Sequence, residues 1–96
     1  MPSFVVETYV PGGDPERFAV DVDGIRAAAD AGLAGGQVRH VRSYLVQADE
    51  MGFHIVEASS ADDVARITDL ASVEVERIVR AVELEPPEAD RAPELK

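Results

Sequence analysis

Three side chains suited to binding chemistry occupy alternate positions in one short segment. His40, Arg42 and Tyr44 fall in Val38–Val46, which reads VRHVRSYLV. Because side chains alternate across a β-strand, the segment predicts a strand with these three on one face. Imidazole is a common ligand of nickel and zinc, whereas Arg42 and Tyr44 could orient an anionic or aromatic ligand.

The second histidine, His54, belongs to the next alternating segment, residues 52–58 (GFHIVEA). If the two segments form a hairpin with Tyr44 opposite His54, His40 lies about 13 Å further along, at about 3.3 Å per residue. One ion cannot bridge that distance. The histidines are therefore candidate metal ligands only together with a carboxylate such as Glu7, or with a residue of a second copy. Hydrogen-bonded interface histidines are the alternative.

Other chemistries find little support in the composition. The chain has no cysteine, which excludes disulfides, thiolate catalysis and thiolate metal sites. Neither of its Gly-Gly pairs precedes the Lys-Ser/Thr of a phosphate-binding loop, so no motif supports nucleotide binding. No Ser-His-Asp catalytic order can be assigned, and the sequence leaves open whether the protein is an enzyme.

Charge and length narrow the class of protein further. The 96 residues include 19 acidic and 9 basic side chains, for a formal net charge of −10. A field of that sign repels phosphate backbones, so we expect no nucleic-acid partner. No segment has the apolar length to cross a bilayer, and the first residues lack the features of a signal peptide, so we expect a soluble, cytoplasmic protein without a membrane partner. All the basic residues but one are arginine, a usage associated with high-GC bacterial genomes.

The predicted secondary structure has the order βαββαβ. Strands are predicted at residues 3–10, 38–46, 52–58 and 76–84. Helices are predicted at residues 22–33, from an apolar stripe, and from Ser60 onward, with Ser60 as the N-cap. This order predicts a ferredoxin-like α+β sandwich, a four-stranded antiparallel sheet with two helices on one face. The domain would span residues 1–84, and residues 85–96 would form a disordered, acidic, proline-rich tail.

Two helices on one face leave the other face of the sheet open. We expect that open face to carry both apolar and polar side chains, namely Val5, Glu7, Tyr9, His40, Arg42, Tyr44, His54 and Val56. Such a face is rarely left to water, so we expect a second copy to cover it in a homodimer. Glu7, Tyr9, Arg42 and Tyr44 are then the candidate ligand-binding residues. A salt bridge between Arg42 and Glu7 is the structural alternative for that pair.

Three segments resemble a known family: MPSFVVETYVPGG, Arg42-Ser43-Tyr44 and GFHIVEASSADDV. They are similar to a small bacterial family of ferredoxin-like proteins, catalogued mostly as a domain of unknown function, which includes a dimeric nickel-binding protein. The resemblance spans residues 1–84 and implies a homodimer that binds a divalent metal such as nickel. The family pattern has tryptophan at the position of His40, histidine at Arg42, cysteine at His54 and histidine near Ile67.

Two functional hypotheses follow. By resemblance, the chain is a small homodimeric protein that binds a divalent metal, with His40 and His54 as ligands. The alternative is a small-molecule enzyme or ligand-binding module of the dimeric α+β barrel type, which would use the open sheet face.

Overall fold

A computed structural model describes residues 1–84 of the chain. Its main elements are β1 (Ser3–Tyr9), α1 (Pro15–Asp30), β2 (Val38–Val46), β3 (Met51–Ala58), α2 (Ala61–Leu70) and β4 (Arg77–Ala81). Short 3-10 turns follow β1 at Pro11–Gly13 and β2 at Gln47–Asp49. The predicted order βαββαβ is confirmed, and β2 has the predicted bounds. The predicted tail at residues 85–96 lies outside the described residues.

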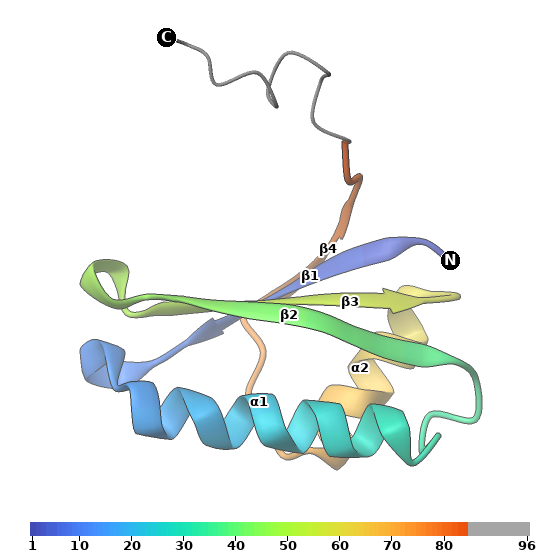
Figure 1. Cartoon of the computed structure of the whole chain (residues 1–96), viewed down its shortest axis with the longest axis horizontal. Coiled ribbons are helices and arrows are strands. Elements are labelled where there is room, and N and C mark those ends of the chain that lie inside the picture. Colours follow the sequence, from blue (N-terminus) through green and yellow to red (C-terminus); the bar gives the residue numbers. More distant parts are fainter. Residues whose placement is uncertain (85–96) are drawn as a thin grey trace, which may run out of the picture.

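The four strands form one antiparallel sheet in the order β2-β3-β1-β4. Both helices lie against the same side of this sheet, α1 running along β2 and α2 beneath the far end of β3 (Figure 1). The chain is therefore a small α+β fold whose elements are compatible with the predicted ferredoxin-like sandwich. The opposite side of the sheet has no helix over it among the described residues.

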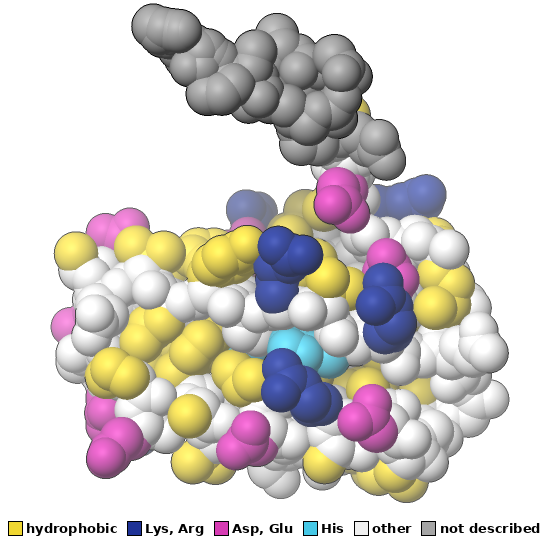
Figure 2. Space-filling model, viewed as in Figure 1, with side chains coloured by type: hydrophobic (Ala, Val, Ile, Leu, Met, Phe, Trp, Pro, Cys, Tyr) yellow, Lys and Arg dark blue, Asp and Glu magenta, His cyan; other side chains and the backbone are white. Residues whose placement is uncertain are grey.

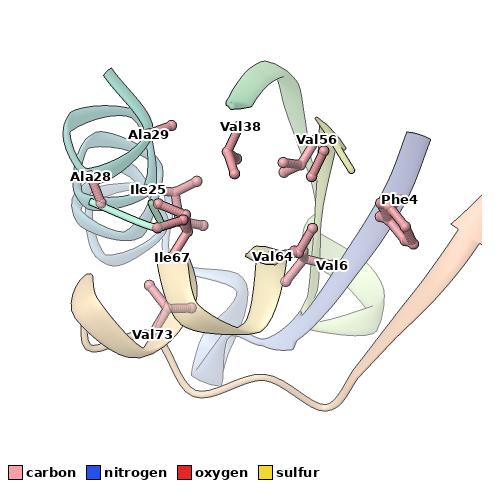
Figure 3. Close-up of a cluster of buried hydrophobic side chains, with 12 residues drawn as sticks. Phe4, Val6, Ile25, Ala28, Ala29, Val38, Val56, Val64, Ile67 and Val73 are labelled. Carbon is pink, nitrogen blue, oxygen red and sulfur yellow. The ribbon is translucent and has the colours of Figure 1, made fainter. Parts of the chain in front are cut away.

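The core lies between the sheet and the two helices. Val6 and Val56 lie on the sheet and face Ile25 of α1 and Val64 and Ile67 of α2, and all five are almost completely buried (Figure 3). Complete burial of a side chain of this kind contributes roughly 1.5–3 kcal/mol. This apolar cluster decides which face of each strand is covered.

The first helix begins seven residues before its predicted start. Asp14 caps it, with a side-chain oxygen that accepts a hydrogen bond from the Glu16 amide at 3.0 Å, and Pro15 occupies the first helical position. Asp-Pro is a favourable helix start, because proline has no amide proton to leave unpaired and its φ suits the first turn. The prediction relied on the apolar stripe, which begins later than the cap. The helix also ends earlier than predicted, and Leu33 is about half exposed.

The second helix begins as predicted. The Ser60 hydroxyl accepts from the Asp63 amide at 3.2 Å, and two acidic residues occupy the first turn. Val64 and Ile67 are buried, whereas Leu70 is exposed. The last strand is shorter than predicted and covers Arg77–Ala81 only.

A β-bulge in β2 overturns part of the predicted face assignment. His40 pairs with Val56 and Arg42 pairs with Ile55, so Val41 is an extra residue without a partner in β3. Since a bulge inserts one residue into the alternation, His40 and Arg42 point to opposite sides of the sheet, although they are two residues apart. His40 therefore lies on the helix side, and its predicted place on the open face is wrong.

The faces of β3 were also assigned the wrong way round. His54 and Val56 are buried on the helix side, whereas Phe53 and Ile55 are only partly buried on the other. The sequence alternates apolar residues on both faces here, and the larger side chains occupy the open face. The predicted open-face positions in β1 and the second half of β2 hold, for Val5, Glu7, Tyr9, Arg42 and Tyr44.

Candidate functional site

Four polar side chains form a continuous hydrogen-bonded chain from the protein surface into its core. The Arg26 guanidinium lies 3.2–3.3 Å from His40 Nδ1. His40 Nε2 lies 2.8 Å from the Ser43 hydroxyl, which in turn lies 2.7 Å from His54 Nδ1. We call these residues the Ser43 chain. The bulge in β2 produces it, because it turns His40 to the side on which Ser43 and His54 are paired.

The donors and acceptors of the Ser43 chain follow one direction. A guanidinium can only donate, so His40 Nδ1 accepts and the ring proton of this histidine is on Nε2. His40 Nε2–H then donates to Ser43 Oγ, and the Ser43 hydroxyl donates to His54 Nδ1. The remaining proton of His54 is therefore on Nε2. That atom is buried and has no hydrogen-bond partner among the described residues.

Both imidazoles of the Ser43 chain are held neutral by their surroundings. His54 is completely buried, and its ring stacks on Phe18 of α1 with centroids 4.9 Å apart. Burial, followed by the nearby His40, lowers the pKa of His54 to about 4. Burial and the Arg26 guanidinium lower the pKa of His40 as well. Neither histidine carries a charge at neutral pH.

A groove between α1 and β2 leads to the Ser43 chain. It has a volume of about 390 Å³ and is lined by Pro15, Phe18, Ala19, Val22, Asp23, Arg26, Ser43 and Leu45. A histidine reaches the surface of this side of the molecule with basic side chains close to it (Figure 2). It is His40, because His54 is fully buried.

The two histidines are much closer than the sequence predicted. Their ring centroids are 6.4 Å apart, because the bulge and the pairing of Ser43 with His54 place both rings on the same side of adjacent strands. The predicted separation of about 13 Å, which assumed Tyr44 opposite His54, is wrong. Tyr44 pairs with Phe53 instead.

This proximity does not by itself make a metal site. Within residues 1–84 no three His, Cys, Asp or Glu side chains are grouped closely enough to hold an ion. The facing nitrogens of His40 and His54 both contact Ser43, and the Arg26 guanidinium occupies the other nitrogen of His40. A dication at this point would be next to a fixed positive charge, so the residues of a single chain do not fit the implied nickel ion.

The open face carries the four residues predicted to bind a ligand, in two separate places. Successive rows across the sheet contain Arg39, Glu57, Ser3 and Ala81, then Arg42, Ile55, Val5 and Val79, then Tyr44, Phe53, Glu7 and Arg77, then Val46, Met51 and Tyr9. Arg42 and Tyr44 line a hollow of about 260 Å³, together with Val41, Ile55 and the end of β4. Arg42 Nη1 lies 3.5 Å from the Tyr44 hydroxyl oxygen and donates a long hydrogen bond to it.

Glu7 and Tyr9 lie away from that hollow and have other partners. Glu7 forms an ion pair with Arg77 at 3.0 Å, so the salt bridge expected with Arg42 is not formed. The Tyr9 hydroxyl donates to Glu50 at 2.8 Å, and that carboxylate raises the pKa of Tyr9. The predicted ligand set is therefore not brought together as a whole.

The sequence interpretation missed three members of the helix-side site, Phe18, Arg26 and Ser43. Phe18 lies before the predicted start of the first helix, and Arg26 gave no motif. Ser43 alternates with Arg42 and Tyr44 and so lies on the helix side, and its position opposite His54 is the one signal that could have revealed the Ser43 chain.

Comparisons with known proteins add no assignment. No family model, curated protein or solved structure matches the chain. No helix within residues 1–84 combines the length and apolar character that crossing a membrane requires.

Proposed function

We propose that the protein is a homodimer in which the open sheet faces of two copies meet and enclose a small-molecule binding cleft. The observation that carries the proposal is the apolar centre of the open face, which no other part of residues 1–84 covers. Val5, Ile55, Phe53 and Val79 are adjacent on neighbouring strands, and Tyr44 lies beside them. A continuous apolar surface of this kind, with charged residues at its edges, is typical of an interface.

The distribution of charge supports contact between two copies. The chain has a net charge of −10, yet the rows of the open face hold three arginines and only two acidic residues. Both of those acids are paired, Glu57 with Arg39 at 2.9 Å and Glu7 with Arg77 at 3.0 Å. Two open faces can therefore approach without opposing the bulk of the negative charge.

The hollow at Arg42 and Tyr44 is the place for a ligand in this proposal. Nothing within residues 1–84 closes it, and in the proposed dimer a second copy would cover it. The guanidinium and the phenol ring suit a small molecule with an anionic group or an aromatic ring. Whether such a molecule is also converted depends on residues that the partner would bring.

Sedimentation equilibrium tests the proposal at micromolar concentration. We expect a mass twice the 10.3 kDa of one chain. Tyr44→Glu should weaken the dimer by about 100-fold, corresponding to about 3 kcal/mol, because a carboxylate would be buried in the interface without a partner. Val20→Glu is the matched control, since Val20 is an exposed apolar residue of α1 and should leave the mass unchanged. A single species of 10.3 kDa for the unsubstituted protein would refute the proposal.

Divalent metal binding by His40 and His54 stays a prediction of the resemblance alone. The open-face dimer would not complete such a site, because both histidines lie on the helix side of the sheet. Calorimetry with nickel on the unsubstituted protein and on His40→Ala tests it. Binding that is lost in the variant would establish the metal function, and equal heats from both proteins would remove it.

A further inference from the structure

One arginine of the open sheet face has no acidic partner within residues 1–84. Arg39 and Arg77, in other rows of the same face, each form an ion pair with a glutamate, at 2.9 and 3.0 Å. Arg42 forms no such pair in this part of the chain, and its hydrogen bond to the Tyr44 hydroxyl is long, at 3.5 Å. A guanidinium has five N–H donors and keeps its charge at neutral pH. The Arg42 guanidinium is therefore available to an acidic group from outside residues 1–84.

The hollow beside Arg42 has mostly apolar walls. The residues after β4 rise on the side of the sheet away from the helices (Figure 1), and Ala81 and Val82 line the hollow there. Val41 and Ile55 supply apolar lining from the sheet. Small-molecule sites typically combine apolar walls with a few polar groups that orient the ligand. Sites for drug-sized ligands begin at roughly 300 Å³, so a hollow of about 260 Å³ suits a smaller molecule.

The charges of the open face indicate a ligand with a single negative charge. The rows of the face hold three arginines and two acids, and the arginine in excess is Arg42. Glu83, which also lines the hollow, and the net charge of −10 disfavour a second negative charge. A phosphate monoester carries about −1.5 to −2 at neutral pH, whereas a carboxylate carries one charge. The two coplanar oxygens of a carboxylate also match the planar fork of a guanidinium.

We propose that this hollow binds a small monocarboxylate with an apolar body. The carboxylate accepts N–H bonds from Arg42 and an O–H bond from Tyr44, whose oxygen accepts from Arg42 and whose proton is free to donate. The apolar body of the ligand lies against Val41, Ile55 and Val82. The site rests on the proposed function, because the second copy of the dimer would close the hollow over the ligand.

Nuclear magnetic resonance titrations, followed at the backbone amides of Arg42 and Tyr44, test the proposal with four probes. Phenylacetate carries both the carboxylate and the ring. Phenylacetamide is its uncharged isostere, phenyl phosphate carries the larger charge, and acetate lacks the ring. We expect phenylacetate to bind at least tenfold more tightly than each of the other three.

Two variants and a control locate the site. Arg42→Gln should lose at least tenfold in phenylacetate affinity, because it removes the charge that the carboxylate needs. Glu83→Gln removes the acid of the hollow wall, so it should tighten binding at least twofold at low ionic strength. Arg17→Gln makes the same change of charge as Arg42→Gln at an exposed position of α1, and it should bind as the unsubstituted protein does.

The proposal is overturned if phenylacetate does not bind, or if any of the other three probes binds equally well. It is also overturned if Arg42→Gln has no larger effect than Arg17→Gln, or if Glu83→Gln does not tighten binding.

Sedimentation equilibrium of the same samples separates the carboxylate site from the dimer. A mass of twice 10.3 kDa without selective binding of phenylacetate would overturn the carboxylate site alone. A single species of 10.3 kDa would refute the dimer, and binding that is lost in Arg42→Gln would then establish the carboxylate site on one chain.

Discussion

Acidification should destabilise this protein chiefly through His54, whose pKa is lowered the most. In the folded chain its pKa is lowered to about 4, whereas in the unfolded chain it returns to the ordinary 6.5. Between these two pH values His54 is protonated in the unfolded state and neutral in the folded state. Stability from this group is therefore complete above pH 6.5 and is lost as the pH falls toward 4.

The expected loss follows from the two pKa values. One proton of difference corresponds to about 1.4 kcal/mol per pH unit, which amounts to about 3 kcal/mol at pH 4. Because His54 is completely buried, solvent does not screen the effect. For a domain whose total stability is of the order of 5–15 kcal/mol, this is a large fraction.

Urea unfolding at a series of pH values measures this contribution against a matched variant. His54→Phe keeps a flat ring against Phe18 and cannot titrate, while all the carboxylates remain in both proteins. The unfolding free energy of the unsubstituted protein, taken relative to that of His54→Phe, should fall by about 3 kcal/mol from pH 7 to pH 4. The imidazole resonances of His54 should also show that the ring stays neutral down to about pH 4. A difference that does not vary with pH would refute the argument.

The remaining predictions concern packing and helix caps. Gly52→Ala should destabilise the fold by about 1–3 kcal/mol, because a Cβ would lie 2.9 Å from the Phe18 ring atom Cδ1. Gly24→Ala is its control, since that Cβ meets the residue after α2 at 3.4 Å and should leave the fold unchanged or stabilise it by up to about 1 kcal/mol. Asp14→Ala and Ser60→Ala should each cost about 1 kcal/mol in chemical denaturation, because each removes a helix N-cap. Equal stabilities for the two alanine variants at glycine positions, or caps without effect, would contradict these assignments.

The element order was predictable because each strand has its own apolar alternation, and β2 was located to the residue. The start of α1 was missed because an amphipathic stripe reports only the packed part of a helix. Asp14-Pro15, which sets the start, is a local signal read from cap chemistry. In β1, where one side of the strand is clearly more polar and no bulge interrupts the alternation, the predicted face was right, as at Glu7 and Tyr9.

The sequence singled out the two histidines of the candidate site, but neither its other members nor its geometry. His40 and His54 were singled out, yet their contact through Ser43 depends on an extra residue in β2 that alternation cannot reveal. Phe53 and Ile55, which flank His54, are larger and apolar, and they were therefore assigned to the core face. The covered face is decided by how β3 pairs with β1 and by the position of the helices, which are not local properties.

The extra residue in β2 has a consequence for comparing this chain with distant homologues. His40 and Arg42 already occupy the faces that they would have in a strand without Val41, where they would be direct neighbours. A homologue that lost this residue would keep every other β2 side chain on its present side and gain a regular ladder. An alignment of such a homologue with this protein is therefore structurally correct only if it leaves one gap opposite Val41. An ungapped alignment would match the histidine to a residue on the wrong side of the sheet and would hide the shared site.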